Sequence, residues 1–100
     1  MSILQKKQTK KWKNENYIGI YICGSGVGMS IVANREKEIR AVIGNNRKVI
    51  ELSRKHNNSN VLCLGARNMM LLRAKLYIKT FLKTKFEGGR HLERVQSIDK

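Results

Sequence analysis

The stretch that decides the fold is YIGIYICGSGVGMS, residues 17–30. Its first half, Tyr17 to Cys23, is a short run of apolar, β-branched and aromatic residues, which is typical of a strand. The glycine loop GSGVG, residues 24–28, follows as a turn, and Met29 to Arg35 continues as a short helix. A strand, a glycine-rich turn and a helix in this order predict the start of an α/β unit.

Two further apolar runs predict strands, Ile39 to Ile43, which Gly44 closes, and Val61 to Gly65. Helical segments alternate with these runs, and the runs are continuously apolar. That pattern is typical of a parallel sheet whose two faces are both covered. We therefore expect an α/β fold with a short parallel sheet of about three strands flanked by helices. One edge of the first strand stays open unless another strand pairs with it.

Three helices are expected in the second part of the chain. The first follows a cap at Asn45 or Asn46, and the last covers Arg90 to Ile98. Between them, Met69 to Phe86 is predicted to be one long helix that Gly88-Gly89 stops. The expected face positions are Val49, Leu52 and His56 on the first helix, and Leu71, Ala74, Ile78 and Phe81 on the long one.

Length and composition restrict the class of protein. With 100 residues, of which 41% are hydrophobic, the chain fits one small globular domain. We expect a basic polar leader at residues 1–16 and a single α/β domain at residues 17–100. No apolar run is long enough to cross a membrane. A basic amphipathic helix can lie on anionic lipid, but the long helix fits better as a core helix with a wet basic face.

Charge and cysteine usage point to the kinds of partner. The balance of 21 basic and 7 acidic residues gives +14, which favours an anionic partner such as nucleic acid or a phosphorylated small molecule. Cys23 and Cys63 form no CxxC pair, and His56 and His91 are scattered singly, so no zinc-ligand spacing is present. The lysine-rich start is followed by polar residues and not by the apolar stretch of a signal peptide, so we expect a cytoplasmic protein with reduced thiols.

The glycine loop is the first candidate site. Glycines let a backbone approach a ligand closely, and the helix start behind them offers unpaired N–H groups to an anion. The spacing matches neither GxGxxG nor a Walker A loop. Cys23 ends the strand beside this loop, where a thiolate can serve as nucleophile or general base. The alternative is that Cys23 is an ordinary buried strand residue; Cys63, inside a strand, is interpreted as structural.

The second group of candidates is basic or amide-bearing. His56-Asn57 closes a helix, either as a C-terminal cap or as a proton donor beside an amide that orients a sugar hydroxyl. Arg90 and Arg94 lie one helical turn apart with His91 between them, and both guanidinium groups can hold one anion. Arg67 follows the third strand, where open parallel sheets bind ligands. The alternative for the arginines is a solvated basic surface.

Five motifs in one order resemble the ribose-5-phosphate isomerase B family, which includes the galactose-6-phosphate isomerase subunits. The resemblance extends from about Tyr17 to Ile98, and the cysteine before the glycine loop matches the ribose-phosphate branch. The motifs are Cys23 to Asn34, Ile39-Arg40-Ala41, His56 to Leu62, Leu64 to Arg67, and Phe86 to His91 with Arg94-Val95.

The resemblance implies a Rossmann-like three-layer sandwich and an aldose–ketose isomerase that needs no metal and no organic cofactor. It implies that Cys23 moves the proton between C1 and C2, that Ser25 and the amides of Gly24, Gly26 and Gly28 hold the enediolate, and that His56 assists ring opening. Asn57 would bind a sugar hydroxyl. The implied phosphate group is Arg67, Arg90 and Arg94, with His91 nearby. The implied assembly is a dimer or tetramer whose site is shared between subunits.

The family begins with a strand, an Asp-His loop, a helix and a second strand that have no counterpart here. We therefore expect a truncated isomerase with reduced or no activity on ribose 5-phosphate, or one portion of a split protein. The competing interpretation is a non-catalytic basic module that binds nucleic acid or another polyanion. The few aromatic residues fall in expected core elements instead of a stacking platform, which makes nucleic acid the less favoured partner.

Overall fold

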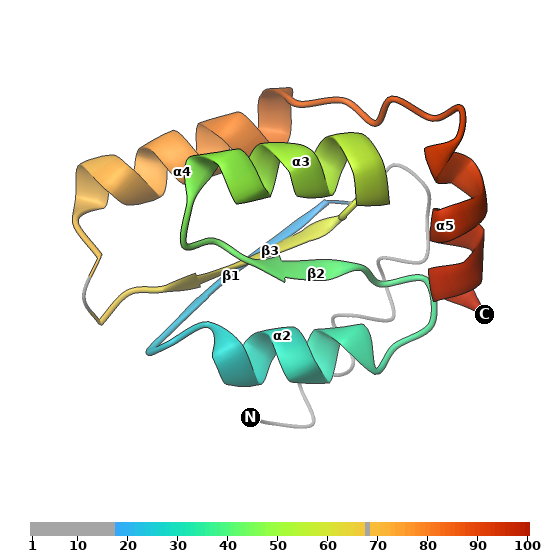
Figure 1. The fold of residues 1–100 in the computed structure, drawn as a ribbon. Coiled ribbons are helices and arrows are strands. Elements are labelled where there is room, and N and C mark those ends of the chain that lie inside the picture. The colour runs from blue at the N-terminus through green and yellow to red at the C-terminus, as the bar shows by residue number, and fades with distance from the viewer. Residues whose placement is uncertain (1–17, 68) are drawn as a thin grey trace.

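Three apolar runs form one parallel sheet in the computed structural model, which describes residues 18–67 and 69–100 (Figure 1). The strands are β1 (Gly19–Cys23), β2 (Ala41–Ile43) and β3 (Val61–Gly65), and their order is β1-β3-β2. The central strand β3 pairs Val61 with Gly19 of β1 and with Ala41 of β2. The predicted leader at residues 1–16 lies outside the described residues.

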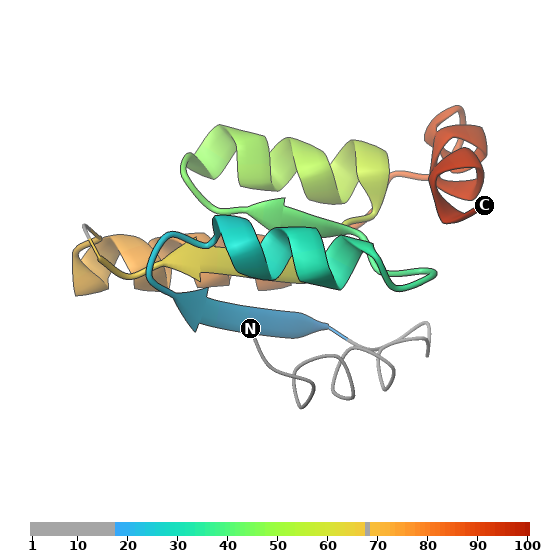
Figure 2. The same cartoon turned by 90° about the horizontal axis from the view of Figure 1, so that it is seen from below.

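Helices cover both faces of this sheet, which confirms the three-layer α/β arrangement. Helix α2 (Val27–Asn34) lies on one face, and α3 (Arg47–Asn57) and α4 (Leu71–Lys83) lie side by side on the other (Figures 1 and 2). Helix α5 (His91–Asp99) packs at the end of the sheet, beside the carboxyl end of α3. An ion pair of 2.7 Å between Arg40 Nη1 and Asp99 Oδ1 joins α5 to the segment before β2.

Alternate residues of β3 supply two separate cores, because successive side chains of a strand point to opposite faces. Val61 and Cys63 pack with Met29 and Ala33 of α2. Leu62 and Leu64 pack against the other layer, where the buried side chains are Ile50 of α3 and Tyr77 and Phe81 of α4. Since β3 is buried on both faces and paired on both edges, it is the centre of the molecule.

Several predicted boundaries were wrong. Helix α4 does not extend from Met69 to Phe86, because it begins at Leu71 and ends at Lys83, with Thr84 as its C-cap. Gly88 and Gly89, which were expected to stop it, have positive φ angles in the turn before α5. Strand β2 is also shorter than predicted, since pairing starts at Ala41.

The faces of α3 and α4 were partly wrong. Val49 is 51% exposed and Leu71 is 70% exposed, so neither lies in the core. Ile50 takes the inward position on α3, and Tyr77 accompanies Phe81 on α4. The hydroxyl of Tyr77 donates to the carbonyl of Asn45, just after β2. The polar end of this side chain therefore has a hydrogen-bond partner while its ring stays buried.

Among the described residues, no strand pairs with the outer edge of β1, as expected from the sequence. Ile22 on this strand is 61% exposed. Within residues 18–67 and 69–100, none of the helices combines the length and the apolar character needed to cross a bilayer.

Candidate active site

The glycine loop connects the end of β1 to the start of α2 (Figure 1). Cys23 is the last residue of β1, directly before this loop. Gly26 adopts a left-handed conformation with φ of 82°, and its N–H donates to Cys23 Sγ at 3.0 Å. Ser25 Oγ accepts from the Val27 amide at 3.2 Å, and the hydroxyl keeps its own proton for donation. Cys23 is half-buried and free of any disulfide. The loop therefore presents a reduced thiol that already accepts one N–H hydrogen bond.

A close contact with the end of β3 fixes the shape of this loop. The Ala66 amide donates to the Cys23 carbonyl at 2.7 Å, and the Arg67 amide donates to the Gly24 carbonyl at 3.1 Å. A Cβ atom on Gly65 would lie 2.5 Å from the Ser25 carbonyl oxygen, so only glycine fits there. The loop therefore rests directly on the backbone of β3.

A hollow of about 380 Å³ opens beside the loop. The guanidinium of Arg67 borders it and lies so close to Gly24 that a Cβ there would be 3.0 Å from Nη2. Arg73 of α4 lines the same hollow, although the sequence indicated only a solvated basic helix face for it. Two guanidinium groups beside the glycine loop make this hollow suited to an anion.

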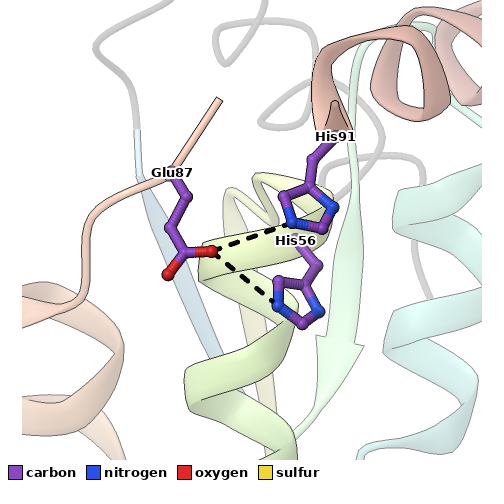
Figure 3. Close-up of side chains that lie close together, drawn as sticks. All are labelled: His56, Glu87 and His91. Carbon is purple, nitrogen blue, oxygen red and sulfur yellow. Dashed lines mark ion pairs between the residues drawn. The ribbon is translucent and has the colours of Figure 1, made fainter. Parts of the chain in front are cut away.

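A second polar group lies at the carboxyl end of α3. His56 stacks on His91, with ring centroids 4.3 Å apart and planes 17° from parallel. Glu87 Oε1 faces both rings, 3.9 Å from His56 Nε2 and 3.7 Å from His91 Nε2 (Figure 3). The two histidines that are scattered in the sequence are therefore neighbours in space.

His91 is the buried member of this group. Its residue is 5% exposed, and burial lowers its pKa, with His56 and Arg90 adding smaller repulsive contributions in the same direction. A lowered pKa keeps this imidazole neutral near neutral pH. Its Nδ1 atom is buried without a hydrogen-bond partner among the described residues.

The predicted site residues fall into two sets, which lie at opposite ends of the strands. Helix α3 runs antiparallel to the strands, so its carboxyl end lies at the end of the sheet away from the glycine loop (Figure 1). The first set, at the carboxyl ends of the strands, is Cys23, Gly24, Ser25, Gly26, Gly28 and Arg67. The second set, near the amino ends of the strands, is His56, Asn57, Arg90, His91 and Arg94. Arg67 is thus not brought together with Arg90 and Arg94 within one copy.

The side chains of the second set differ in exposure. Asn57, Arg90 and Arg94 are exposed, whereas His56 is half-buried. The left-handed cap of α3 is Asn58, with φ of 48°, and not Asn57 as the sequence suggested. A larger hollow of about 580 Å³ lies near the Arg40–Asp99 ion pair, and of all the predicted residues it contains only Asn57.

Comparison with known proteins identifies the family of this chain. The model of the ribose/galactose isomerase family matches residues 4–98, which is nearly the whole chain. The chain belongs to the ribose/galactose isomerase family. The resemblance noted in the sequence is thereby confirmed.

Named members of the family are similar along most of this chain. Ribose-5-phosphate isomerase B of Escherichia coli is 48% identical over 80% of this chain and 54% of its own length. A probable ribose-5-phosphate isomerase B of Mycoplasma pneumoniae is 42% identical over 85% of this chain and 56% of its own. The chain thus spans about half the length of these curated relatives.

Solved structures of the family share the fold. Ribose 5-phosphate isomerase B of Thermotoga maritima superposes with a TM-score of 0.87 at 43% identity, over 95% of this chain and 66% of that one. The enzyme of Mycoplasma genitalium, solved with bound ribulose-5-phosphate, gives a TM-score of 0.82 at 38% identity, over 96% of this chain and 62% of that one.

Two residues of these clusters were missed by sequence reasoning. Arg73 could not be told apart from the many other cations of its helix, and only its place in the first turn of α4, close in sequence to Arg67, hinted at a shared hollow. Glu87 was quoted as part of a motif without a role. Its spacing of four residues from His91 was the available signal, because such pairs share one side of a helix or turn.

Proposed function

We propose that this chain is a sugar-phosphate aldose–ketose isomerase that converts ribose 5-phosphate to ribulose 5-phosphate through an enediolate. Family membership and the two named isomerases support the reaction class. The observation that carries the proposal is the 3.0 Å hydrogen bond from the Gly26 amide to Cys23 Sγ at the start of α2. This contact fixes the sulfur beside the glycine loop, where a base for the proton transfer is needed.

In the proposed reaction Cys23 is the base. Its thiolate removes the proton from C2 of the open-chain aldose, the electron pair forms the C1–C2 double bond, and the C1 carbonyl oxygen takes the negative charge of the enediolate. The proton of the C2 hydroxyl then passes to the C1 oxygen, the thiol returns its proton to C1, and the C2 oxygen becomes the ketone. C2 is oxidised and C1 is reduced by the same amount, so the step needs no external oxidant or reductant. Ser25 and the amides of the glycine loop stabilise the charge on the oxygens.

Ring opening and the binding of the sugar and its phosphate are assigned mainly to the second set of residues. His56 transfers a proton during opening of the sugar ring, and Asn57 binds a hydroxyl. Arg90, the N-cap residue of α5, and Arg94, in the helix itself, are both exposed. They hold the phosphate together with His91. Arg67 supplies a further positive charge beside the glycine loop.

Because these sets lie at opposite ends of the strands, we propose that two copies of the chain combine to form each site. In a homodimer or larger homo-oligomer, the carboxyl ends of the strands in one copy would face the amino ends of the strands in another copy. Exposed apolar side chains support self-association, since Leu72 is 75% exposed and Leu76, one turn further along α4, is 46% exposed.

The first test measures ribulose 5-phosphate formation by the purified chain. We expect turnover, slower than that of the full-length Escherichia coli relative measured alongside, because the curated relatives are almost twice as long as this chain. Cys23→Ser should reduce the rate about 10²–10⁴-fold, the range that a positioned proton-transfer group contributes. Cys63→Ala is the matched control and should retain activity. Wild-type turnover in Cys23→Ser would rule out the proposed base.

Mixing two inactive variants tests the shared site. Cys23→Ser and His56→Ala would each be inactive alone, but a mixed dimer contains one site in which both residues are intact. Equal amounts dissociated and reassembled should regain about a quarter of the wild-type activity, because half of the dimers are mixed and each has one working site of two. No recovery from variants shown to exchange subunits would contradict the two-copy site.

A further inference from the structure

Arg73 lines the hollow beside the glycine loop together with Arg67, and the proposed reaction assigns it no role. None of the residues that line this hollow is acidic. Within residues 18–67 and 69–100, neither guanidinium group has an ion pair or a hydrogen bond. Two unpaired positive charges that border one hollow favour an anion between them. We propose that Arg73 is a specificity-determining residue that binds, together with Arg67, the phosphate group of a phosphorylated sugar.

The geometry of α4 directs Arg73 toward the glycine loop. The helix begins at Leu71, at the end of the sheet where β3 finishes, so Arg73 lies in its first turn (Figure 1). The side chains of a helix tilt toward its N-terminus, which here is the end nearest the loop. Tyr77 follows four residues later, on the same side of the helix, and is buried against the sheet. Arg73 therefore lies over the carboxyl end of the sheet, one turn beyond Tyr77.

Hydrogen bonds hold the other side of the hollow in place. The Arg67 amide donates to the Gly24 carbonyl at 3.1 Å, which fixes Arg67 beside the loop. The Tyr77 hydroxyl donates its only proton to the Asn45 carbonyl at 3.1 Å, so it has none left for a ligand. The Ser25 hydroxyl accepts from a backbone amide and keeps its proton. The side-chain donors that the hollow offers to an anion are therefore this hydroxyl and the two guanidinium groups.

Charge and size favour a phosphate monoester in this hollow. A monoester carries a charge of about −1.5 to −2 near pH 7, which two guanidinium groups match, whereas a diester carries a single charge. The volume of about 380 Å³ admits the end of a small molecule. The inference rests on the proposed function, which supplies a sugar phosphate as the ligand. In the two-copy site, the phosphate would lie between these arginines and the second set of the other copy.

Calorimetric titration of the purified full chain with inorganic phosphate and with ribose 5-phosphate, at constant ionic strength, tests the role of Arg73. Arg73→Gln should weaken the binding of both ligands about tenfold, because the phosphate loses a charged hydrogen-bond donor. Lys75→Gln is the matched control, since Lys75 is an exposed cation of the same helix that does not line the hollow. Both variants lose one positive charge, and the control should stay within about twofold of wild type.

Steady-state kinetics of the same variants separate binding from chemistry. Arg73→Gln should raise KM with little change in kcat, because a contact with the phosphate acts equally before and during the reaction. A fall in kcat at unchanged KM would overturn the inference, since it would place Arg73 at the reacting carbons.

Three binding results would also overturn it: no binding of either ligand at millimolar concentration, equal affinities of Arg73→Gln and Lys75→Gln, or wild-type affinity for dimethyl phosphate, a diester, as high as for inorganic phosphate. These titrations do not depend on turnover. A chain that is inactive but binds inorganic phosphate through Arg73 would contradict the proposed isomerase and leave the phosphate site standing.

Discussion

The two cysteines occupy adjacent strands but have different surroundings. Cys23 ends β1 beside the glycine loop and is half-buried, whereas Cys63 lies in β3 and is fully buried. Burial raises the pKa of the Cys63 thiol from 9.0 to about 12, and the Cys23 sulfur adds a smaller contribution. Cys63 is therefore a packing residue, as predicted from its place inside a strand, and cannot share the chemistry proposed for Cys23.

The raised pKa of Cys63 predicts a loss of stability at alkaline pH. Below pH 9.0 the thiol is protonated in both states, so the contribution is complete there. Between pH 9.0 and about 12 the unfolded chain releases a proton that the folded chain retains, and stability falls as pH rises. One pH unit into this window the loss should reach about 1 kcal/mol.

Urea unfolding of wild type and Cys63→Ala on either side of pH 9.0 checks this prediction. The variant should be less stable below pH 9.0, because a small buried side chain has been shortened. Its stability should, however, fall less steeply with rising pH than that of wild type. Parallel pH profiles for the two proteins would show that Cys63 does not ionise on unfolding.

At the scale of elements, α3 has the best-defined start. Asn46 adopts an extended conformation, and its Oδ1 accepts from the amides of Lys48 at 2.8 Å and Val49 at 3.2 Å. The sequence predicted a cap at Asn45 or Asn46 without choosing between them. The choice depends on the exit of the chain from β2, where the Asn45 carbonyl instead accepts from the Tyr77 hydroxyl.

Loss of this cap should destabilise the protein without abolishing folding. Asn46→Ala should cost about 1 kcal/mol, because two amide groups of the first turn lose their partner. Asn45→Ala is the control, since its backbone contact survives the substitution and its stability should stay within about 0.5 kcal/mol of wild type. Chemical denaturation of both variants measures the difference. Equal losses would indicate that the cap contributes nothing specific.

The elements differ in how well they could be predicted, and the reasons are physical. Strand β3 is predicted residue for residue, because an apolar run between turns has few alternatives. The end of α4 could not be predicted, since contacts with α3 draw the following segment away. Arg54 Nε donates to the Thr84 carbonyl at 3.0 Å, and the Glu87 amide reaches Lys55. Such tertiary contacts leave no local signal in the sequence.

The candidate site also has one part that follows from local sequence and one part that depends on tertiary contacts. The loop from Cys23 to Val27 was predictable, because glycines between a strand and a helix form a local motif. The stacking of His56 on His91 was not, since it depends on two left-handed glycines, Gly88 and Gly89, that turn the chain toward α3. The individual roles assigned to these residues stay predictions.

At the scale of the whole molecule, the charge of +14 raises the question of nucleic-acid binding. Aromatic side chains in the described part of the chain do not form a stacking surface, because Tyr77 and Phe81 are buried in the core. The cations Arg73, Lys75 and Lys79 are exposed along α4. Such an arrangement supports contacts with phosphates but not with bases.

We therefore expect weak binding of nucleic acid that disappears as salt is raised. Gel retardation with single- and double-stranded DNA and RNA should show complexes at low salt and none at micromolar protein near physiological salt, because the attraction depends on counterion release. Micromolar binding that survives physiological salt would favour the basic-module function over the isomerase.

The contact between the glycine loop and β3 also restricts how this chain can evolve. A methyl group on Gly65 would meet the Ser25 carbonyl at 2.5 Å, and one on Gly26 would meet the Gly65 amide at 3.2 Å in a backbone region that disfavours side chains. Neither position can drift by itself, because the obstacle in each case is the other segment's main chain. Any lineage that acquires a new ligand preference must do so through the side chains around this joint, and Arg73, on a separate helix, is free to change first.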